Sequence, residues 1–192
     1  MEVKNNNREV ILKTALGLFS SRGYESVGIQ EIVDRSNITK PTLYYYFGSK
    51  RGLLDAIISE YGEVLFNSIN ENAVYSRDIV QNLTNITRVV INFAISNQAF
   101  YRLLQSLSAA APENAGYAAC RPLRISINTC LETLFTEAAF DHGNMKGREK
   151  AYSETFQGMI RTWALLILNN DVEFDEQMLY RAVHQFMHGI FS

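Results

Sequence analysis

Apolar residues recur at the three- and four-residue spacing of amphipathic helices along nearly the whole chain. A first helix is expected after the Asn5–Asn7 cluster, whose side chains can cap its terminal amides, and Gly23 is expected to end it. The pattern therefore predicts that an amphipathic helix precedes residue 23. The residues that form its buried face are Ile11, Leu12, Ala15, Leu18 and Phe19.

Two short helices are predicted next, at about residues 28–36 and 40–47. Asn37 stands where a tight turn requires a positive φ, which Asn tolerates better than most residues. Thr39 can cap the second short helix, and Pro41 suits its first turn because the N–H that proline lacks has no intrahelical partner there. Two short helices joined by the three residues 37–39 are the pattern of a helix-turn-helix motif.

Longer helices are predicted over the rest of the chain. Gly48 ends the second short helix, and Ser49 caps the next one. Only three prolines and eleven glycines interrupt the 192 residues, which favours helices over a β fold with many turns. The expected helices span about 49–71, 76–96, 97–112, a segment that starts or bends at Pro122 and ends near 142, then 147–168 and 173–190.

Charge is distributed unevenly along the chain. The formal net charge is −2, but residues 1–55 hold eight Lys and Arg against six Asp and Glu, and residues 56–192 hold ten against fourteen. A mildly basic head on an acidic body fits contact with DNA through the head alone.

Membrane and secretion signals are not expected. The first eight residues, Met-Glu-Val-Lys-Asn-Asn-Asn-Arg, contain no apolar core of the kind that a signal peptide needs. The richest apolar run, from Trp163 to Leu168, is far shorter than the roughly 18 residues of a membrane-spanning helix. We therefore expect a soluble, cytoplasmic protein with no membrane partner.

The N-terminal residues resemble those of a known family. The run from Ala15 to Tyr24, then Ile32, then Thr39-Lys-Pro-Thr-Leu-Tyr-Tyr-Tyr-Phe-Gly-Ser-Lys50, closely resembles the DNA-binding head of TetR-family regulators. The resemblance is specific over about residues 8–58, and beyond them it is only architectural. It implies an all-α fold of about nine helices, with a three-helix DNA-binding domain at residues 1–48 and a helical regulatory domain at residues 49–192.

The resemblance also implies a function. Most members of the family are repressors that bind palindromic operators as homodimers and release them when a small molecule occupies the body. We expect the same here, with the identity of the effector undetermined. Two alternatives stay open: a DNA-bound regulator that senses no small molecule, and an activator.

Three positions depart from the family pattern. Gly28 occupies a position where members usually place Thr or Ser, so the side-chain contact to a phosphate is missing, although glycine can still cap a helix. Asn37 replaces the usual turn glycine, and Tyr46 stands where His is frequent. None of the three conflicts with the fold.

The DNA contacts follow from the helix-turn-helix geometry, in which the N-terminal residues of the second helix lie nearest the base edges. Lys40 can donate to guanine, and Pro41 and Thr42 can contact a thymine methyl group. Hydroxyls and ammonium groups next to them can bind phosphates and fix the register. The predicted DNA-binding residues are Gly28, Thr39, Lys40, Pro41, Thr42, Tyr44, Tyr45 and Lys50.

Two sets of apolar residues in the body carry further predictions. Stripes on the last two helices suit pairing with the same helices of a second subunit, and middle-helix aromatics suit an apolar effector pocket, although such residues are more often simple core. The predicted dimer interface is Phe156, Ile160, Trp163, Ile167, Leu179, Val183, Phe186, Met187 and Ile190. The predicted effector residues are Phe66, Phe93, Phe100, Tyr101, Tyr117, Phe156 and Trp163.

Neither catalysis nor a resident metal or cofactor is predicted. The chain contains no dinucleotide fingerprint, phosphate loop, nucleophile elbow or zincin motif, and its three histidines all lie beyond residue 140. His184 and His188 have a spacing that can bind zinc, but the sequence places no third ligand beside them. Cys120 and Cys130 stand roughly 15 Å apart on one continuous helix and are expected to be buried thiols.

Overall fold

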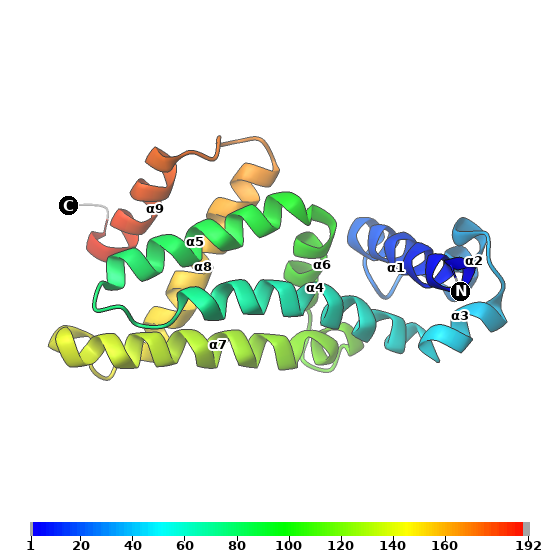
Figure 1. Ribbon diagram of the computed structural model, residues 1–192, viewed down its shortest axis with the longest axis horizontal. Helices are drawn as coiled ribbons and strands as arrows, with labels where there is room; N and C mark the ends of the chain where they lie inside the picture. The colour runs from blue at the N-terminus through cyan, green and yellow to red at the C-terminus, as the bar shows by residue number, and fades with distance from the viewer. Residues whose placement is uncertain (1, 190–192) are drawn as a thin grey trace. The chain divides into compact units, whose positions relative to one another are not determined.

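The computed structural model of the protein describes residues 2–189, and for residues 2–6 and 144 it describes the backbone only. Within that range all regular secondary structure is helical, which confirms the predicted all-α class (Figure 1). The helices are α1 (Glu2–Arg22), α2 (Ile29–Ser36), α3 (Lys40–Phe47), α4 (Lys50–Asn72), α5 (Ile79–Ser96), α6 (Gln98–Ser108), α7 (Ala115–Asp141), α8 (Glu149–Leu168) and α9 (Glu176–His188), with a short 3₁₀ turn, η1 (Gly143–Met145).

The chain forms two compact units, and each contains two separate stretches of sequence. Unit 1 comprises the residues up to Glu63 together with Ala99–Leu123, and unit 2 comprises Val64–Gln98 together with the residues from Arg124 onward. Helices α4 and α7 therefore each contribute residues to both units. The predicted domains 1–48 and 49–192 divide the chain at a different place and stay a prediction about where each function resides.

The first three helices of unit 1 pack on one another around a small apolar core. The side chains of Ile11, Phe19 and Leu43 are completely inaccessible to solvent. Burial of aliphatic and aromatic side chains of this size contributes roughly 1.5–3 kcal/mol each, which is what holds such short helices in place. The predicted buried face of α1 is confirmed in full.

Two sequence expectations about helix ends are wrong. α1 begins at Glu2 and runs through the Asn5–Asn7 cluster, because no Gly or Pro interrupts residues 2–16 and Asn costs only some tenths of a kcal/mol inside a helix. α7 does not start at Pro122: it begins at Ala115, after Asn114 accepts a hydrogen bond from Gly116 N at 2.7 Å. Proline removes one backbone donor, a loss that the 27-residue helix tolerates.

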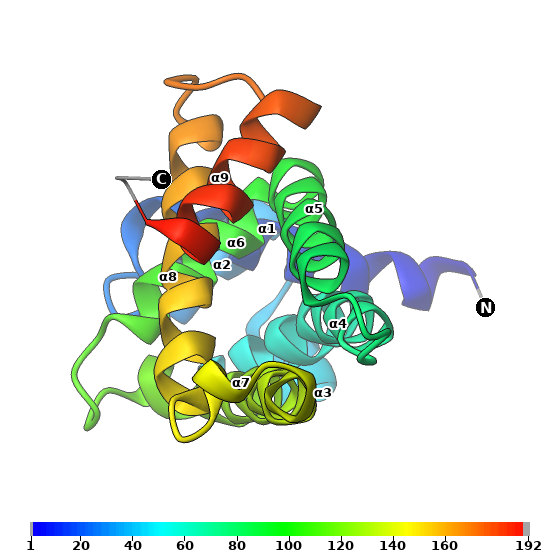
Figure 2. The same ribbon diagram turned by 90° about the vertical axis from the view of Figure 1, so that its left-hand side faces the viewer.

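Helices α5, α8 and α9 pack on one another in unit 2, where the two views agree that α9 lies along α5 and α8 (Figures 1 and 2). Aromatic rings of α7, α8 and α9 meet in this unit: the centroids of Phe156 and Phe186 lie 5.3 Å apart, and Phe135 of α7 meets Phe156 edge-on with centroids 6.3 Å apart. Arg88 of α5 forms a bidentate ion pair with Glu176 at the start of α9.

Asn82 of α5 anchors the loop between α4 and α5. Its amide donates to the carbonyls of Asn72 and Val74 at 2.8 and 2.9 Å, and its carbonyl accepts from the N–H and hydroxyl of Ser76 at 3.2 and 3.1 Å. The side chain is only 5% exposed. All of its hydrogen-bonding capacity is therefore used to fix the start of α5 against the end of α4.

Candidate DNA interface

The turn between α2 and α3 has the geometry that the sequence predicts. Gly28 caps α2 from an extended conformation, without a side-chain hydrogen bond, and Asn37 ends that helix in the left-handed region at φ +51°. The backbone N–H of Asn37 bonds the carbonyl of Asp34, and the N–H of Ile38 bonds that of Val33. These bonds close a tight turn that leads directly into α3.

The first turn of α3 is capped by Thr39. Its hydroxyl accepts from the backbone N–H of Thr42 at 3.4 Å and lies 2.9 Å from the hydroxyl of Thr42. Thr39, Lys40 and Pro41 are exposed, and Thr42 is half-buried. The residues predicted to contact bases therefore lie together at the N-terminal end of one solvent-facing helix.

The tyrosines of α3 divide between solvent and packing. Tyr44 and Tyr45 are 46% and 72% exposed, which leaves their hydroxyls accessible to phosphate oxygens. Tyr46 is half-buried, and the centroid of its ring lies 5.1 Å from that of Tyr45 and 6.1 Å from that of Phe47. Leu43, on the opposite face, is fully buried.

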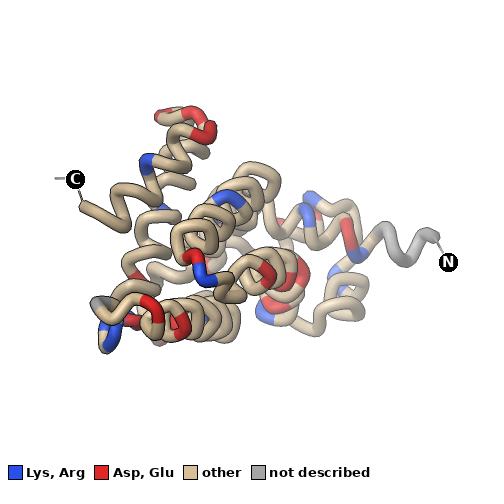
Figure 3. Tube along the Cα trace, turned by 60° about the vertical axis from the view of Figure 1, so that its left-hand side comes forward, with Lys and Arg blue, Asp and Glu red and all other residues tan. Residues whose placement is uncertain are grey.

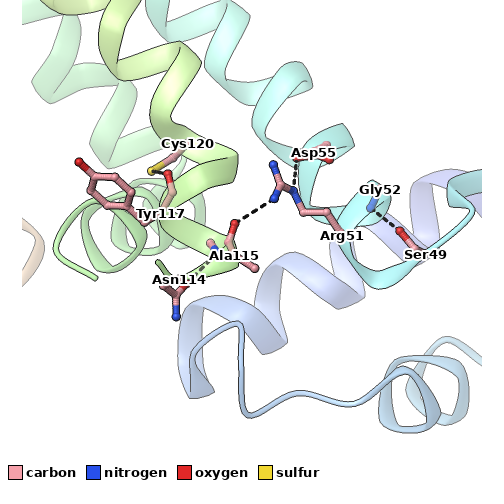
Figure 4. A network of polar contacts seen from close by, with 9 residues as sticks. Ser49, Arg51, Gly52, Asp55, Asn114, Ala115, Tyr117 and Cys120 are labelled. Atoms are coloured by element: carbon pink, nitrogen blue, oxygen red, sulfur yellow. Dashed lines mark hydrogen bonds and ion pairs between the residues drawn. The ribbon is translucent and has the colours of Figure 1, made fainter. Parts of the chain in front are cut away.

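A sharp connection joins α3 to α4. Gly48 adopts φ +70°, and the hydroxyl of Ser49 accepts from Gly52 N at 2.9 Å, which confirms the predicted cap (Figure 4). A Cβ at Gly52 would lie 2.1 Å from the carbonyl oxygen of Phe47. Only glycine fits there. The glycine therefore allows the start of α4 to approach the end of α3 closely.

Arg51 extends this connection to α7. Its guanidinium donates to Asp55 at 2.8 Å and to the backbone carbonyl of Ala115, the first residue of α7, at 3.2 Å (Figure 4). Both bonds lie within unit 1. The role of Arg51 is not evident from the sequence, because Ala115 stands 64 residues away.

Lys50 is placed differently from the other predicted DNA-binding residues. It is half-buried, its ammonium lies 4.3 Å from the centroid of the Tyr24 ring, and it donates to the carbonyl of Glu25 at 3.3 Å. Burial lowers the pKa of the Lys50 ammonium below its ordinary value, and the charge of Glu25 partly offsets that effect.

The head is not a uniformly basic surface. Figure 3 shows Lys and Arg residues interspersed with Asp and Glu among the N-terminal helices. Glu31 of α2 pairs with both Arg22 and Arg35, the second at 3.4 Å. Both arginines are therefore already paired with a carboxylate of the head.

Known proteins match both the head and the whole chain. Residues 11–57 match the model of the family described as bacterial regulatory proteins, tetR family. The activator FasR of Mycolicibacterium smegmatis is 24% identical over 97% of this chain and 83% of its own length. The N-terminal domain is that of the TetR-family transcriptional regulators. The match to the family model falls on the helix-turn-helix described above, so the DNA-binding function that the sequence predicts is confirmed.

Solved structures of TetR-family proteins share the fold of the whole chain. A Clostridium perfringens protein described as a candidate fatty acid metabolism regulator superposes with a TM-score of 0.79 at 20% identity, over 94% of this chain and 98% of its own. FadR of Bacillus subtilis in complex with stearoyl-CoA superposes with a TM-score of 0.75 at 14% identity, over 95% and 98%.

The predicted effector residues fall in both units. In unit 1, Phe100 and Tyr101 of α6 are buried, Phe100 stacks on Tyr61 with centroids 5.2 Å apart, and Tyr117 of α7 is half-buried. In unit 2, Phe93 and Phe156 are buried. Phe66 and Trp163 in the same unit are half-buried.

The predicted dimer residues divide between core and surface of unit 2. Trp163, Ile167, Phe186 and Met187 are half-buried, and Ile190 lies outside the described residues. Four others are almost fully buried within the subunit: Phe156, Ile160, Leu179 and Val183. Periodicity identifies the apolar stripe but cannot separate the part that faces the core from the part that faces a partner.

The remaining sequence features carry no site in the described part of the chain. His184 and His188 stack with centroids 4.5 Å apart, and no cluster of three or more His, Cys, Asp or Glu side chains suited to a metal occurs among the described residues. Cys120 is buried, Cys130 is half-buried, and neither forms a disulfide. Across residues 2–189, no helix combines the length and apolarity that crossing a bilayer requires.

Proposed function

We propose that the protein is a homodimeric repressor that binds a palindromic operator and is released from it by a long-chain fatty acyl-CoA. One observation carries the choice of effector: the shared fold covers 95% of this chain and 98% of FadR, whose structure holds stearoyl-CoA. The similarity includes the body of the protein, where an effector is proposed to bind, and is not confined to the DNA-binding head. The function consists of binding alone, without catalysis, in the cytoplasm, where bacterial DNA is found.

The proposed DNA contacts come from the amino end of α2 and from α3. Lys40, Pro41 and Thr42 read base edges in the major groove, while Thr39, Tyr44 and Tyr45 bind the backbone beside them. Gly28 contributes its backbone at the amino end of α2, where unsatisfied N–H groups favour a phosphate. Exposure of these side chains supports the assignment.

The proposed dimer interface is an open groove on α8 and α9. It has a volume of about 720 Å³ and is lined mainly by half-exposed side chains of the two helices, among them Met159, Trp163, Leu166 and Phe186. Gly158 lies in the middle of α8 within this groove, and a Cβ there would meet no atom within 4 Å. A glycine inside a helix weakens the helix by roughly 1 kcal/mol, and no packing inside the subunit requires one at position 158. Close packing of a helix from a second copy would require the small residue.

The proposed effector site is apolar, as a long acyl chain requires. The middle helices supply buried and half-buried aromatic side chains in each unit. A saturated chain gains roughly 0.8 kcal/mol for each methylene group that it buries. The residues that the sequence predicts for effector binding are Phe100, Tyr101 and Tyr117 in unit 1, and Phe66, Phe93, Phe156 and Trp163 in unit 2.

An activator is the second candidate function. FasR, which aligns with 97% of this chain, is named an activator. Both candidates require operator binding and an effector, and they differ in whether RNA polymerase is excluded or recruited. Transcription from a template that carries the operator distinguishes them: the protein lowers the yield of transcript if it is a repressor and raises it if it is an activator.

The proposal is tested by selecting bound DNA from a random pool and measuring the mass of the complex on the selected site. We expect an inverted repeat that binds an even number of chains. Isothermal titration with stearoyl-CoA, and with CoA as the control, is expected to show binding of the acylated form only. Selection of a site without two-fold symmetry, or equal binding of CoA, contradicts the proposal.

A further inference from the structure

The corner between α3 and α4 joins the recognition helix closely to the first turn of α4. The hydroxyl of Ser49 accepts from Gly52 N at 2.9 Å, and the N–H of Ser49 bonds the carbonyl of Phe47 at 2.7 Å. A Cβ at Gly52 would lie 2.1 Å from the Phe47 carbonyl oxygen, so the two backbones leave no space between them. A shift of the first turn of α4 therefore moves the end of the recognition helix. It also moves Lys50, which the sequence predicts to bind DNA.

Arg51 connects that turn of α4 to the first turn of α7. Figure 4 shows its guanidinium between the carboxylate of Asp55, one turn further along α4, and the backbone carbonyl of Ala115. Nε donates to Asp55 at 2.8 Å, and Nη1 donates to Ala115 at 3.2 Å. A guanidinium can make both bonds at once because its donors form a planar fork. The local ion pair thus holds the side chain in the direction that reaches α7.

The first turn of α7 carries both the carbonyl that Arg51 binds and a predicted effector residue. Asn114 caps this turn by accepting from Gly116 N at 2.7 Å. The turn lies close against α6, since a Cβ at Gly116 would come within 2.5 Å of an α6 side chain. Tyr117, which the sequence predicts to bind the effector, follows directly. All of these residues belong to unit 1, as do α3 and the start of α4.

We propose that Arg51 is a positioning residue through which the effector controls DNA binding. Its hydrogen bond to the carbonyl of Ala115 favours the arrangement that binds the operator, and an effector beside Tyr117 breaks that bond by displacing the first turn of α7. A contact made in only one of two states is what allows a ligand to shift the balance between them. The step that involves the effector rests on the function proposed above, whereas the first step concerns DNA binding alone. The predicted contact of Lys50 with DNA is compatible with this role.

The test is a double-mutant cycle on the operator affinity of the full-length protein, measured at several salt concentrations. Arg51→Met removes the donors and keeps a long side chain, and Asn114→Ala removes the cap of the turn that Arg51 binds. Arg51→Lys keeps the positive charge and can still pair with Asp55, but a single ammonium lacks the planar fork. Asp78→Ala is the matched control, because it removes the cap of α5, which lies in unit 2.

We expect Arg51→Met and Asn114→Ala each to bind the operator roughly fivefold more weakly, the lower end of typical coupling between two sites. The double variant is expected to bind no more weakly than Arg51→Met, because both changes remove the same contact. Arg51→Lys is expected to behave like Arg51→Met, and Asp78→Ala to leave operator affinity unchanged in either background. Saturating stearoyl-CoA is expected to bring the wild type and Arg51→Met to the same operator affinity, since the effector has then broken the contact in the wild type.

Three results overturn the role of Arg51. Unchanged operator affinity in Arg51→Met shows that the contact does not matter, and losses that multiply in the double variant show that Arg51 and Asn114 act separately. Wild-type affinity in Arg51→Lys, with a salt slope that falls by about 0.9 in Arg51→Met, makes Arg51 a phosphate contact.

Failure of the proposed effector gives a different result. If stearoyl-CoA leaves the operator affinity of the wild type unchanged, the effector proposed above is wrong, and the cycle with Asn114→Ala still decides the role of Arg51. If Arg51→Met fails to fold, Arg51→Lys takes its place in the cycle.

Discussion

Lys40 is the first residue of α3 and is exposed in the turn that a helix-turn-helix places nearest the base edges. Its ammonium can reach guanine O6 and N7 in the major groove. We predict that Lys40→Ala lowers affinity for the selected operator by roughly 1–3 kcal/mol and relaxes the preference at one or two base pairs. Binding to a panel of single-base operator variants measures both effects.

The same panel separates base recognition from phosphate binding by Lys40. A loss of equal size on every sequence in the panel would place the ammonium on the DNA backbone. Lys13→Met, on the exposed face of α1, provides the control for removing one positive charge from the head.

Asn82 makes a prediction about stability. Asn82→Asp keeps the shape and the acceptors of the side chain but removes the two hydrogen bonds that it donates to Asn72 and Val74. We expect the free energy of unfolding at neutral pH to fall by about 3 kcal/mol, because a carboxylate faces two carbonyls at a buried site. Chemical denaturation checks this value. The exposed neighbour supplies the control: Gln81→Ala is expected to change stability by less than about 0.5 kcal/mol.

Local chemistry makes some of these residues predictable from sequence and leaves others hidden. The left-handed turn at Asn37 and the Thr39 cap depend on their own conformational preferences and on partners within three residues, so the sequence identifies both. The partners of Lys50 lie 25 residues away, and its contact with them depends on the direction of one flexible side chain. The sequence therefore predicts a cation near the DNA-binding surface, but it does not predict the contacts of that cation with Tyr24 and Glu25.

At the scale of one helix, Gly158 of α8 makes a prediction about assembly. We predict that Gly158→Leu converts the protein to a monomer, because the added side chain projects into the groove that a second copy is proposed to fill. The variant subunit is expected to be as stable as the wild type or slightly more stable, since leucine favours a helix by up to about 1 kcal/mol over glycine. Sedimentation velocity measures the change in mass.

A matched glycine on another helix tests whether that effect is specific to the groove. Gly17 of α1 also has open space where a Cβ would lie, and Gly17→Leu is expected to leave the mass in solution unchanged. If Gly158→Leu keeps the mass and the dissociation constant of the wild type, the interface lies elsewhere.

Most elements follow from periodicity, and the exceptions have physical causes. The starts and ends of α2 and α3 are marked by capping residues, and the sequence places them within one residue. Pro122 stands inside α7, where it removes one backbone donor without ending the helix. In α8 and α9 the apolar stripe is correctly located, but only packing shows that Phe156 and Val183 face the core while Trp163 is partly open.

For the whole molecule, the assignment of function combines two kinds of similarity. The family match explains the helix-turn-helix, and the similarity of fold extends over nearly the whole chain. A dimer brings two recognition helices to half-sites one helical turn of DNA apart, roughly 34–36 Å, which is why a palindrome is expected. Because the repressor is proposed to bind DNA and acyl-CoA in different states, each ligand must weaken the binding of the other by the same factor.

The most direct test is the affinity of the protein for its selected operator as stearoyl-CoA is added at fixed salt concentration. We predict a fall of roughly 5- to 150-fold at saturation, the range of typical coupling between two sites, with CoA alone having no effect. Operator affinity that stays constant while stearoyl-CoA is shown to bind, or that rises, would contradict release by an acyl-CoA.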